Sequence, residues 1–225
     1  MIEALLCDID GTLVDSNHLH AESWQRSFAY FGIHTTVEKV IRQIGKGSEN
    51  LLPVFVPADK LEHIRTPLED YRKHLFKSEY LSRVKPFPRA RDFLLRLRDA
   101  GIRLALASSA SKEDLEIYKN IVGMTDLIEE SSSADDAARS KPHPDIFAAT
   151  LQKLGLPADR CLALGDTPWD AEAARKCGLW TIGVTSGGWS EKDLLTAGCL
   201  KVYPAVADLL DNFETSPLVA PITPA

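Results

Sequence analysis

The second half of the sequence alternates short apolar segments with stretches of helical periodicity. Three of the apolar segments read "IRLALAS", "CLALGD" and "LWTIGV". Strands that alternate with helices in this way are joined by right-handed crossovers and form a parallel sheet. We therefore predict an α/β fold. The helices predicted around these strands span residues 89–100, 111–122, 145–154 and 169–177, with a short extended segment at 126–129.

A long helical region separates the first predicted strand, residues 2–9, from the others. Helical spacing runs over residues 18–31, where Gly32 ends it, and over residues 36–83, with a break at Gly45-Lys46-Gly47. No convincing strand interrupts this region. We therefore predict one domain built from residues 1–15 and 85–215, with a helical domain, residues 16–84, inserted into it.

Charge and hydropathy narrow the class of protein. The chain of 225 residues has a formal net charge of −6 and an apolar content of 44%, which supports a substantial core. Nucleic acids and anionic membranes bind clustered Lys and Arg, so the acidic balance argues against both as partners. No apolar run approaches the roughly 20 residues that a bilayer-spanning helix needs. Any anionic ligand must therefore be met by local positive groups.

The two ends of the sequence and its cysteines bear on where the protein works. The first residues enter a strand at once, with no basic segment or cleavage site, which predicts a cytoplasmic protein. Residues 216–225 carry three prolines and no periodicity, so we expect a loose tail. The cysteines show no C-x-x-C pairing, which predicts reduced core residues rather than a zinc site or disulfides. They are Cys7, Cys161, Cys177 and Cys199.

Acidic and hydroxyl side chains follow several predicted strands where each strand ends. Asp8 and Asp10 close the first apolar run, Ser108 and Ser109 follow "LALA", and Asp166 ends "LALGD" with Asp170 four residues on. In an open parallel sheet, ligands bind outside the carboxyl ends of the strands. We therefore expect these side chains to gather at one edge. Like charges held this close are costly unless a positive group or a proton separates them.

A divalent cation explains such a group of carboxylates. Mg²⁺ takes one or two carboxylates together with waters and phosphate oxygens. With Mg²⁺ bound, Asp8 can stay ionised and attack phosphorus, while Asp10 can hold a proton on the leaving-group side. Phosphoryl transfer also needs donors to the nonbridging oxygens. Ser108 and Lys141, in the proline-rich segment "SKPHPDIF", are candidate donors, and Asp170 could orient the lysine.

Four segments resemble, in order, the four motifs of the haloacid dehalogenase (HAD) superfamily. They read "DIDGTLVDS", "LALASSA", "KPHPDIF" and "GDTPWDAEAARKCG", and they run from Asp8 to Gly178. The resemblance is to the group of phosphoglycolate phosphatases and β-phosphoglucomutase-like proteins. It implies a Rossmann-like catalytic core and an α-helical cap between the first and second motifs, where the inserted helical domain is predicted.

The resemblance also implies a role for each matching residue. Asp8 would be the nucleophile and Asp10 the acid/base, and Ser108 and Lys141 would bind the phosphate. The implied Mg²⁺ ligands are Asp8, the main-chain carbonyl of Asp10, and Asp166, with Asp170 nearby.

Further residues are weaker candidates for the site. Ser109 could donate its backbone N–H to phosphate, whereas Ser111 is best explained as a helix cap. Thr12 offers a hydroxyl, although a turn explains it equally well. His20 matches a histidine that β-phosphoglucomutase-like members carry after the first motif, and its plain alternative is packing. Lys46 lies where such proteins often place a specificity loop, and a helix–helix turn explains it equally well.

We expect a Mg²⁺-dependent phosphatase that hydrolyses a small phosphorylated metabolite, such as a sugar phosphate or a phosphoglycolate-like compound, through an aspartyl-phosphate on Asp8. A phosphosugar mutase of the β-phosphoglucomutase kind is the first alternative, although "GDTPWD" looks more like the phosphatase form of the fourth motif. A dehalogenase is disfavoured, because a metal-free site would not easily tolerate Asp10 and Asp166. A non-enzymatic phosphate-binding regulator is the last alternative. We expect a monomer or a homodimer.

Overall fold

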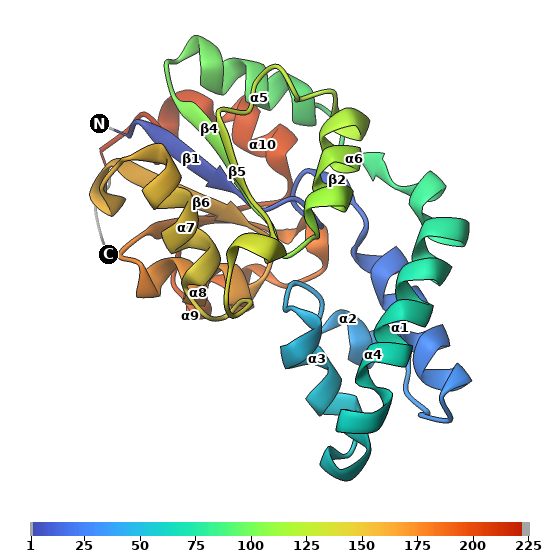
Figure 1. Ribbon diagram of the computed structural model, residues 1–225. Helices are drawn as coiled ribbons and strands as arrows, with labels where there is room; N and C mark the ends of the chain where they lie inside the picture. The colour runs from blue at the N-terminus through green and yellow to red at the C-terminus, as the bar shows by residue number, and fades with distance from the viewer. Residues whose placement is uncertain (1, 222–225) are drawn as a thin grey trace.

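Six parallel strands form the central sheet in the order β5-β4-β1-β6-β7-β8 (Figure 1). The computed structural model describes residues 2–221. Cys7, the last residue of β1, pairs with Leu106 of β4 on one side and Leu164 of β6 on the other, so these three strands end at one edge. The strands are β1 (Ala4–Cys7), β4 (Arg103–Ala107), β5 (Glu130–Ser132), β6 (Cys161–Gly165), β7 (Trp180–Val184) and β8 (Cys199–Tyr203).

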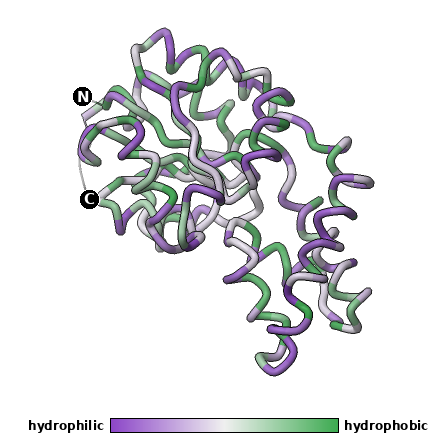
Figure 2. Tube along the Cα trace, viewed as in Figure 1, coloured by the Kyte–Doolittle hydropathy of each residue, from purple (hydrophilic) through white to green (hydrophobic). Residues whose placement is uncertain are grey.

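Helices cover both faces of the sheet, which explains why its two middle strands, β1 and β6, are apolar at every position. Leu5 and Cys7 pack with α5 (Ala90–Asp99), α6 (Lys112–Val122) and α10 (Val206–Asp211) on one face. Ala4 and Leu6 point to the other face, against α7 (Asp145–Leu154) and α8 (Pro168–Lys176). Figure 2 shows hydrophobic residues running along the strands, with hydrophilic residues along the surrounding helices. The predicted α/β class with a parallel, Rossmann-like core is confirmed.

Ser111 and Gly123 set the two ends of α6, and a short helix and several turns complete the core. Ser111 caps α6 as expected, because its side chain accepts a hydrogen bond from the N–H of Asp114, and Gly123 ends the helix at a φ of 69°. The remaining elements of the core are α9 (Glu191–Ala197) and the 3₁₀ turns η3 (Ala134–Asp136), η4 (Ala158–Arg160), η5 (Thr185–Gly187) and η6 (Phe213–Thr215).

Residues 17–83, which we call the cap, form a helical unit beside the core (Figure 1). Trp24, Phe28 and Leu68 are buried in an apolar cluster separate from those of the core. The chain leaves and re-enters the core through β2 (Val14–Asp15) and β3 (Lys85–Pro86), which pair antiparallel. The cap contains α1 (Asn17–Tyr30), α2 (Val37–Ile41), α3 (Ser48–Phe55) and α4 (Ala58–Leu75), followed by the π-helical turn η1 (Phe76–Tyr80) and the 3₁₀ turn η2 (Leu81–Arg83). Among residues 2–221, no helix combines the length and the hydropathy that crossing a bilayer requires.

The structure differs from the sequence-based expectation at two strands. β5 lies at Glu130–Ser132 rather than at 126–129. β8 and its flanking helices α9 and α10 were not predicted at all. β8 lies at the end of the sheet, and Lys201 at its centre is exposed, so its short sequence "CLKVY" lacks the continuous apolar pattern of a buried strand.

The expected loose tail needs a correction where it begins. Ser216 and Leu218 are buried, and Leu218 belongs to the same apolar cluster as Leu209 and Phe213. The Ser216 hydroxyl donates a hydrogen bond to the Phe213 carbonyl at 2.7 Å. Residues 216–218 therefore pack on the core despite their proline, while 222–225 lie outside the described residues.

Two neighbouring residues test this packing. Leu218 is 1% exposed, whereas Val219 is 42% exposed. We expect Leu218→Ala to lower the free energy of unfolding by at least about 2 kcal/mol, because it leaves a cavity in the core. Val219→Ala, the matched control, should change it by less than about 0.5 kcal/mol. Urea denaturation followed by circular dichroism measures both; equal, small effects would show that this segment contributes nothing to the core.

Candidate active site

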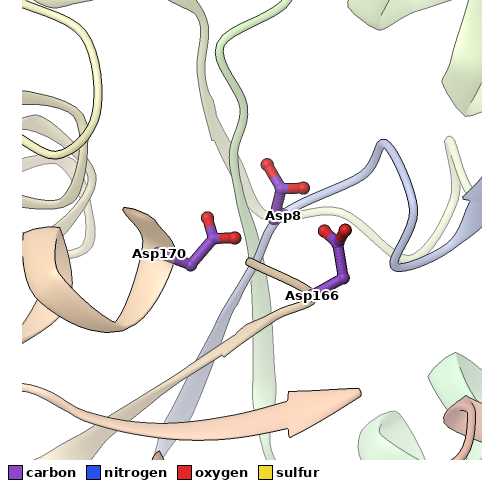
Figure 3. Close-up of side chains that lie close together, drawn as sticks. All are labelled: Asp8, Asp166 and Asp170. Atoms are coloured by element: carbon purple, nitrogen blue, oxygen red, sulfur yellow. The ribbon is translucent and has the colours of Figure 1, made fainter. Parts of the chain in front are cut away.

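Three aspartates converge at the carboxyl edge of the central strands (Figure 3). Asp8 directly follows β1 and its N–H donates to the Leu164 carbonyl at 2.9 Å, which continues the pairing with β6. Asp166 directly follows β6, and Asp170 lies in the first turn of α8. One carboxylate oxygen from each of the three lies within 4.8 Å of the others, and all three residues are buried. The structure thus brings together the acids of the first and fourth motifs.

Lys141 places a positive charge among these acids. Its side chain is only 1% exposed, and its Nζ lies 2.6 Å from Asp8 Oδ1 and 2.7 Å from Asp170 Oδ1. The same ammonium donates to the Ala107 carbonyl at the end of β4, at 2.9 Å. Burial lowers the pKa of Lys141, but the Asp170 and Asp8 carboxylates more than offset this effect and raise it overall. The two carboxylates therefore favour the charged form of the lysine.

Asp170 is held on both oxygens. Oδ1 faces Lys141, and Oδ2 accepts hydrogen bonds from the hydroxyl and the N–H of Thr167, at 2.6 and 3.1 Å. The bond from the Thr167 N–H, together with one from the Asp170 N–H to the Thr167 hydroxyl, forms the capping box that begins α8. The geometry therefore favours Asp170 as the residue that orients Lys141 over a direct role as a metal ligand.

Asp166 is oriented by two side chains from the segment after β1. The Thr12 hydroxyl donates to Oδ1 at 3.1 Å, and Asn17 Nδ2 donates to Oδ2 at 2.8 Å. A Cβ at either Gly11 or Gly187 would overlap this carboxylate, so the backbone on both sides must be glycine. Thr12 thus helps to orient the Asp166 carboxylate through its hydroxyl. Asn17 was not predicted, because an asparagine at the start of a helix carries no sign of a partner 149 residues away.

The charges of the cluster do not balance. Burial raises the pKa of Asp8 to about 7 even though Lys141 lowers it, and burial with the nearby Asp170 and Asp8 raises the pKa of Asp166 well above its usual range. With all three carboxylates ionised, one ammonium leaves two negative charges uncompensated. A divalent cation held by oxygen ligands, as Mg²⁺ prefers, would supply the missing charge. The donor set therefore fits this metal.

The Asp10 side chain turns away from the three acids toward the cap. Its Oδ1 accepts a hydrogen bond from the Ser16 hydroxyl at 2.5 Å and lies 2.9 Å from His20 Nε2 on α1. Burial raises the pKa of Asp10, but the charge and the hydrogen bond of His20, with the hydrogen bond from Ser16, lower it overall. The two acids of "DID" thus face different partners. Asp8 faces Lys141, whereas Asp10 faces His20.

A cavity of about 280 Å³ lies between the core and the cap, above Asp8 and Asp10. The cap side is lined by His20, Trp24, Lys46 and Arg72, among others. The core side includes Ser109, Ser111, Asp114 and Tyr118. Arg72 and Tyr118 were not among the predicted site residues, yet an Arg72 Nη contacts His20 Nδ1 and the Tyr118 hydroxyl lies 3.2 Å from His20 Nε2.

The remaining predicted site residues occupy distinct positions. Ser108 is fully buried and is not among the residues that line the cavity, and its hydroxyl accepts a hydrogen bond from the Ala110 N–H at 3.1 Å. Ser109 lines the cavity and lies 3.4 Å from the Gly45 carbonyl of the cap. Lys46 also lines it, with its Nζ 2.7 Å from Gln43 Oε1 and 3.9 Å from the centre of the Trp169 ring, and burial lowers its pKa.

Comparison with known proteins agrees with this geometry. A phosphorylated carbohydrates phosphatase of Thermotoga maritima is 28% identical over 205 residues, covering 88% of this chain and 93% of that protein. A phosphoglycolate phosphatase of Rhodospirillum rubrum is 28% identical over 220 residues, covering 94% and 90%. A crystal structure of a hydrolase from Pseudomonas syringae superposes with a TM-score of 0.86 at 27% identity, covering 95% of this chain and 98% of that one.

These likenesses agree with the predicted superfamily and with the predicted enzyme class, a phosphoric monoester hydrolase. The family model for haloacid dehalogenase-like hydrolases matches residues 2–178, which include all four motifs and the cap between the first two. The chain therefore belongs to the haloacid dehalogenase-like hydrolase family.

Proposed function

We propose that this protein is a Mg²⁺-dependent phosphatase that hydrolyses a small phosphorylated metabolite through an aspartyl-phosphate on Asp8. The placement of Asp8 carries the proposal. One of its oxygens is held by Lys141 at 2.6 Å, and the residue also lines the cavity under the cap. A carboxylate oriented by a fixed cation at the base of a cavity is suited to attack a bound phosphoryl group.

The groups around Asp8 would bind the transferred phosphate. Lys141 offers a buried positive charge, and Ser108 and Ser109 offer donors at the end of β4. Asp8 and Asp166, with the main-chain carbonyl of Asp10, would hold Mg²⁺. When bound, the metal would neutralise the acids and stabilise the charge on the nonbridging oxygens of the phosphate.

Asp10 would handle the protons of the two steps. It lies at the cavity beside His20, whose Nε2 is 2.9 Å away, so the pair can share a proton. In the first step Asp10 protonates the leaving oxygen, and in the second it accepts a proton from the water that attacks the acyl phosphate. Residues of the cap line the side of the cavity opposite the acids, where they would limit the access of bulk water to bound substrate.

The size and lining of the cavity support a small substrate. About 280 Å³ is at the lower limit for a ligand pocket. Lys46, Arg72 and Lys73 add positive charge on its cap side, which suits an anionic metabolite. The two named relatives act, according to their names, on phosphorylated carbohydrates and on phosphoglycolate, and both compounds belong to this class.

Removing the nucleophile tests the central step. We expect Asp8→Asn to lower kcat for phosphate esters by at least about a thousandfold, because an amide cannot form the aspartyl-phosphate. Phosphate release from a panel of esters, with Mg²⁺ present, measures the loss. The exposed Asp59 on α4 provides the matched control Asp59→Asn, which should keep full activity. An Asp8→Asn protein that retains substantial activity would refute the mechanism.

Metal binding can be tested without any substrate. Since only the folded protein assembles the acids, saturating Mg²⁺ should raise the melting temperature by several degrees relative to the protein in chelator. Asp166→Asn should abolish most of this increase, because it removes a proposed ligand. Asp159→Asn, which alters an exposed acid after α7, should leave the increase intact. Differential scanning calorimetry measures all three; an unchanged response in Asp166→Asn would contradict the assignment of the ligand.

The second candidate function is a phosphosugar mutase of the β-phosphoglucomutase kind, favoured by the contact between His20 and Asp10. In a mutase the aspartyl-phosphate must survive until a sugar accepts the phosphate. Glucose 1-phosphate supplied with a sugar bisphosphate primer separates the two functions. We expect free phosphate as the main product; conversion to an isomeric sugar phosphate without net phosphate release would establish the mutase instead.

A further inference from the structure

The first turn of α3 on the cap contacts the core loop that carries Lys141. The Ser140 N–H donates a hydrogen bond to Glu49 Oε1 at 2.6 Å. Asn50 Nδ2 donates to the Lys141 carbonyl at 3.2 Å and lies 3.4 Å from the Ser140 carbonyl. Two adjacent cap side chains thus bind the backbone of residues 140–141, which is about 90 residues away in the sequence.

The two segments approach so closely that no side chain fits between them. A Cβ added to Gly47, just before α3, would overlap both the Cβ and the Oγ of Ser140. The backbone of Gly47 itself is ordinary, with φ −68° and ψ 161°, so the requirement for glycine comes from contact alone. The cap and the Lys141 loop therefore fit together at the level of their backbones.

From the core, the Lys141 ammonium is held by Asp8, Asp170 and the Ala107 carbonyl, whereas core side chains bind the backbone of the loop at its margins. The Arg139 N–H donates to Asp145 Oδ2 at 3.1 Å, and Lys176 Nζ donates to the Pro142 carbonyl at 2.6 Å. Between these two points, the N–H of Ser140 and the carbonyl of Lys141 have their side-chain partners on the cap. The residue whose ammonium lies between Asp8 and Asp170 is thus tethered from the cap at its own peptide groups.

We propose that Glu49 and Asn50 are positioning residues that fix Lys141 through its backbone, so that docking of the cap also sets the ammonium between Asp8 and Asp170. The cap then does more than cover the substrate. The lysine proposed to bind phosphate is held in its working position only while the cap is docked on the core. This inference rests on the role proposed for Lys141, but its structural part can be measured without catalysis.

Amide exchange provides that measurement. We expect Glu49→Ala to speed hydrogen–deuterium exchange of the Ser140 amide by about tenfold, because it removes a hydrogen bond to a charged acceptor. Glu49→Gln keeps an acceptor oxygen and should restore most of the protection. Glu62→Ala, at an exposed position of α4, is the matched control and should not alter exchange. Ser140 exchange that is identical in the wild type and in Glu49→Ala would overturn the proposal.

The reactivity of Lys141 reports on the side chain itself. Lys141 is 1% exposed and Lys119 8% exposed, so both should resist acetic anhydride in the wild type. Asn50→Asp keeps the shape of the side chain but removes the amide donor, and it should raise acetylation of Lys141 several-fold while leaving Lys119 unchanged. The same substitution at the exposed Asn120 on α6 serves as the control. Equal protection of Lys141 in Asn50→Asp and Asn120→Asp would overturn the proposal.

Kinetics then distinguish positioning from a direct contact with substrate. If Asn50 acts through Lys141, Asn50→Asp should lower kcat and kcat/KM by the same factor, about tenfold, with KM unchanged. A rise in KM alone would mean that Asn50 binds substrate, and the proposal would fail. Gly47→Ala should reproduce the loss by steric separation, and adding Ser140→Gly should recover activity by restoring the space.

The outcomes for this inference and for the proposed function remain separable. A wild-type protein without phosphatase activity would refute the proposed function, while faster exchange of Ser140 in Glu49→Ala and greater labelling of Lys141 in Asn50→Asp would still establish the positioning. Conversely, active wild-type enzyme with no response to these substitutions would refute the positioning alone.

Discussion

Lys141 carries a positive charge into the interior of the protein, and the arrangement of the site depends on how that charge is compensated. Burying an ammonium costs several kcal/mol unless ion pairs and hydrogen bonds replace its water. Here the replacements are Asp8, Asp170 and the Ala107 carbonyl, which come from the ends of β1, α8 and β4. The parallel sheet supplies them at one point because β1 and β4 are neighbours whose ends coincide.

When its acids are ionised, the same cluster has more negative than positive charge, and this excess favours the binding of a divalent cation. Asp8 and Asp166 are buried with raised pKa values, so their ionised forms are costly, and a divalent cation bound between them would offset this cost. Asp10 is excluded from this group because Ser16 and His20 bind it from the cap side. Two acids one residue apart thus have separate environments, Asp8 beside Lys141 and Asp10 beside His20.

The motif residues could be predicted from the sequence, whereas most of their partners could not. Asp8, Asp166 and Lys141 follow strands or sit in a stiff proline-rich segment, and both signals are local. Asn17 and Arg72 are ordinary helical residues in the sequence, and only the packing of α1 and α4 brings them to Asp166 and His20. The edge strand β8 was missed for a related reason, since a half-exposed strand lacks a continuous apolar pattern.

By itself, the sequence determined the class of fold, the order of the four motifs and the types of chemical group at the strand ends. It could do so because the periodicity of apolar residues and the residue types are properties of short segments. Only the tertiary structure decided which groups face one another. It paired Asp10 with His20, turned Asp170 toward Lys141, and set Glu49 and Asn50 on the lysine's loop. These contacts join residues far apart in the chain, and they exist only because the packing of helices on a twisted sheet brings distant segments within hydrogen-bonding distance.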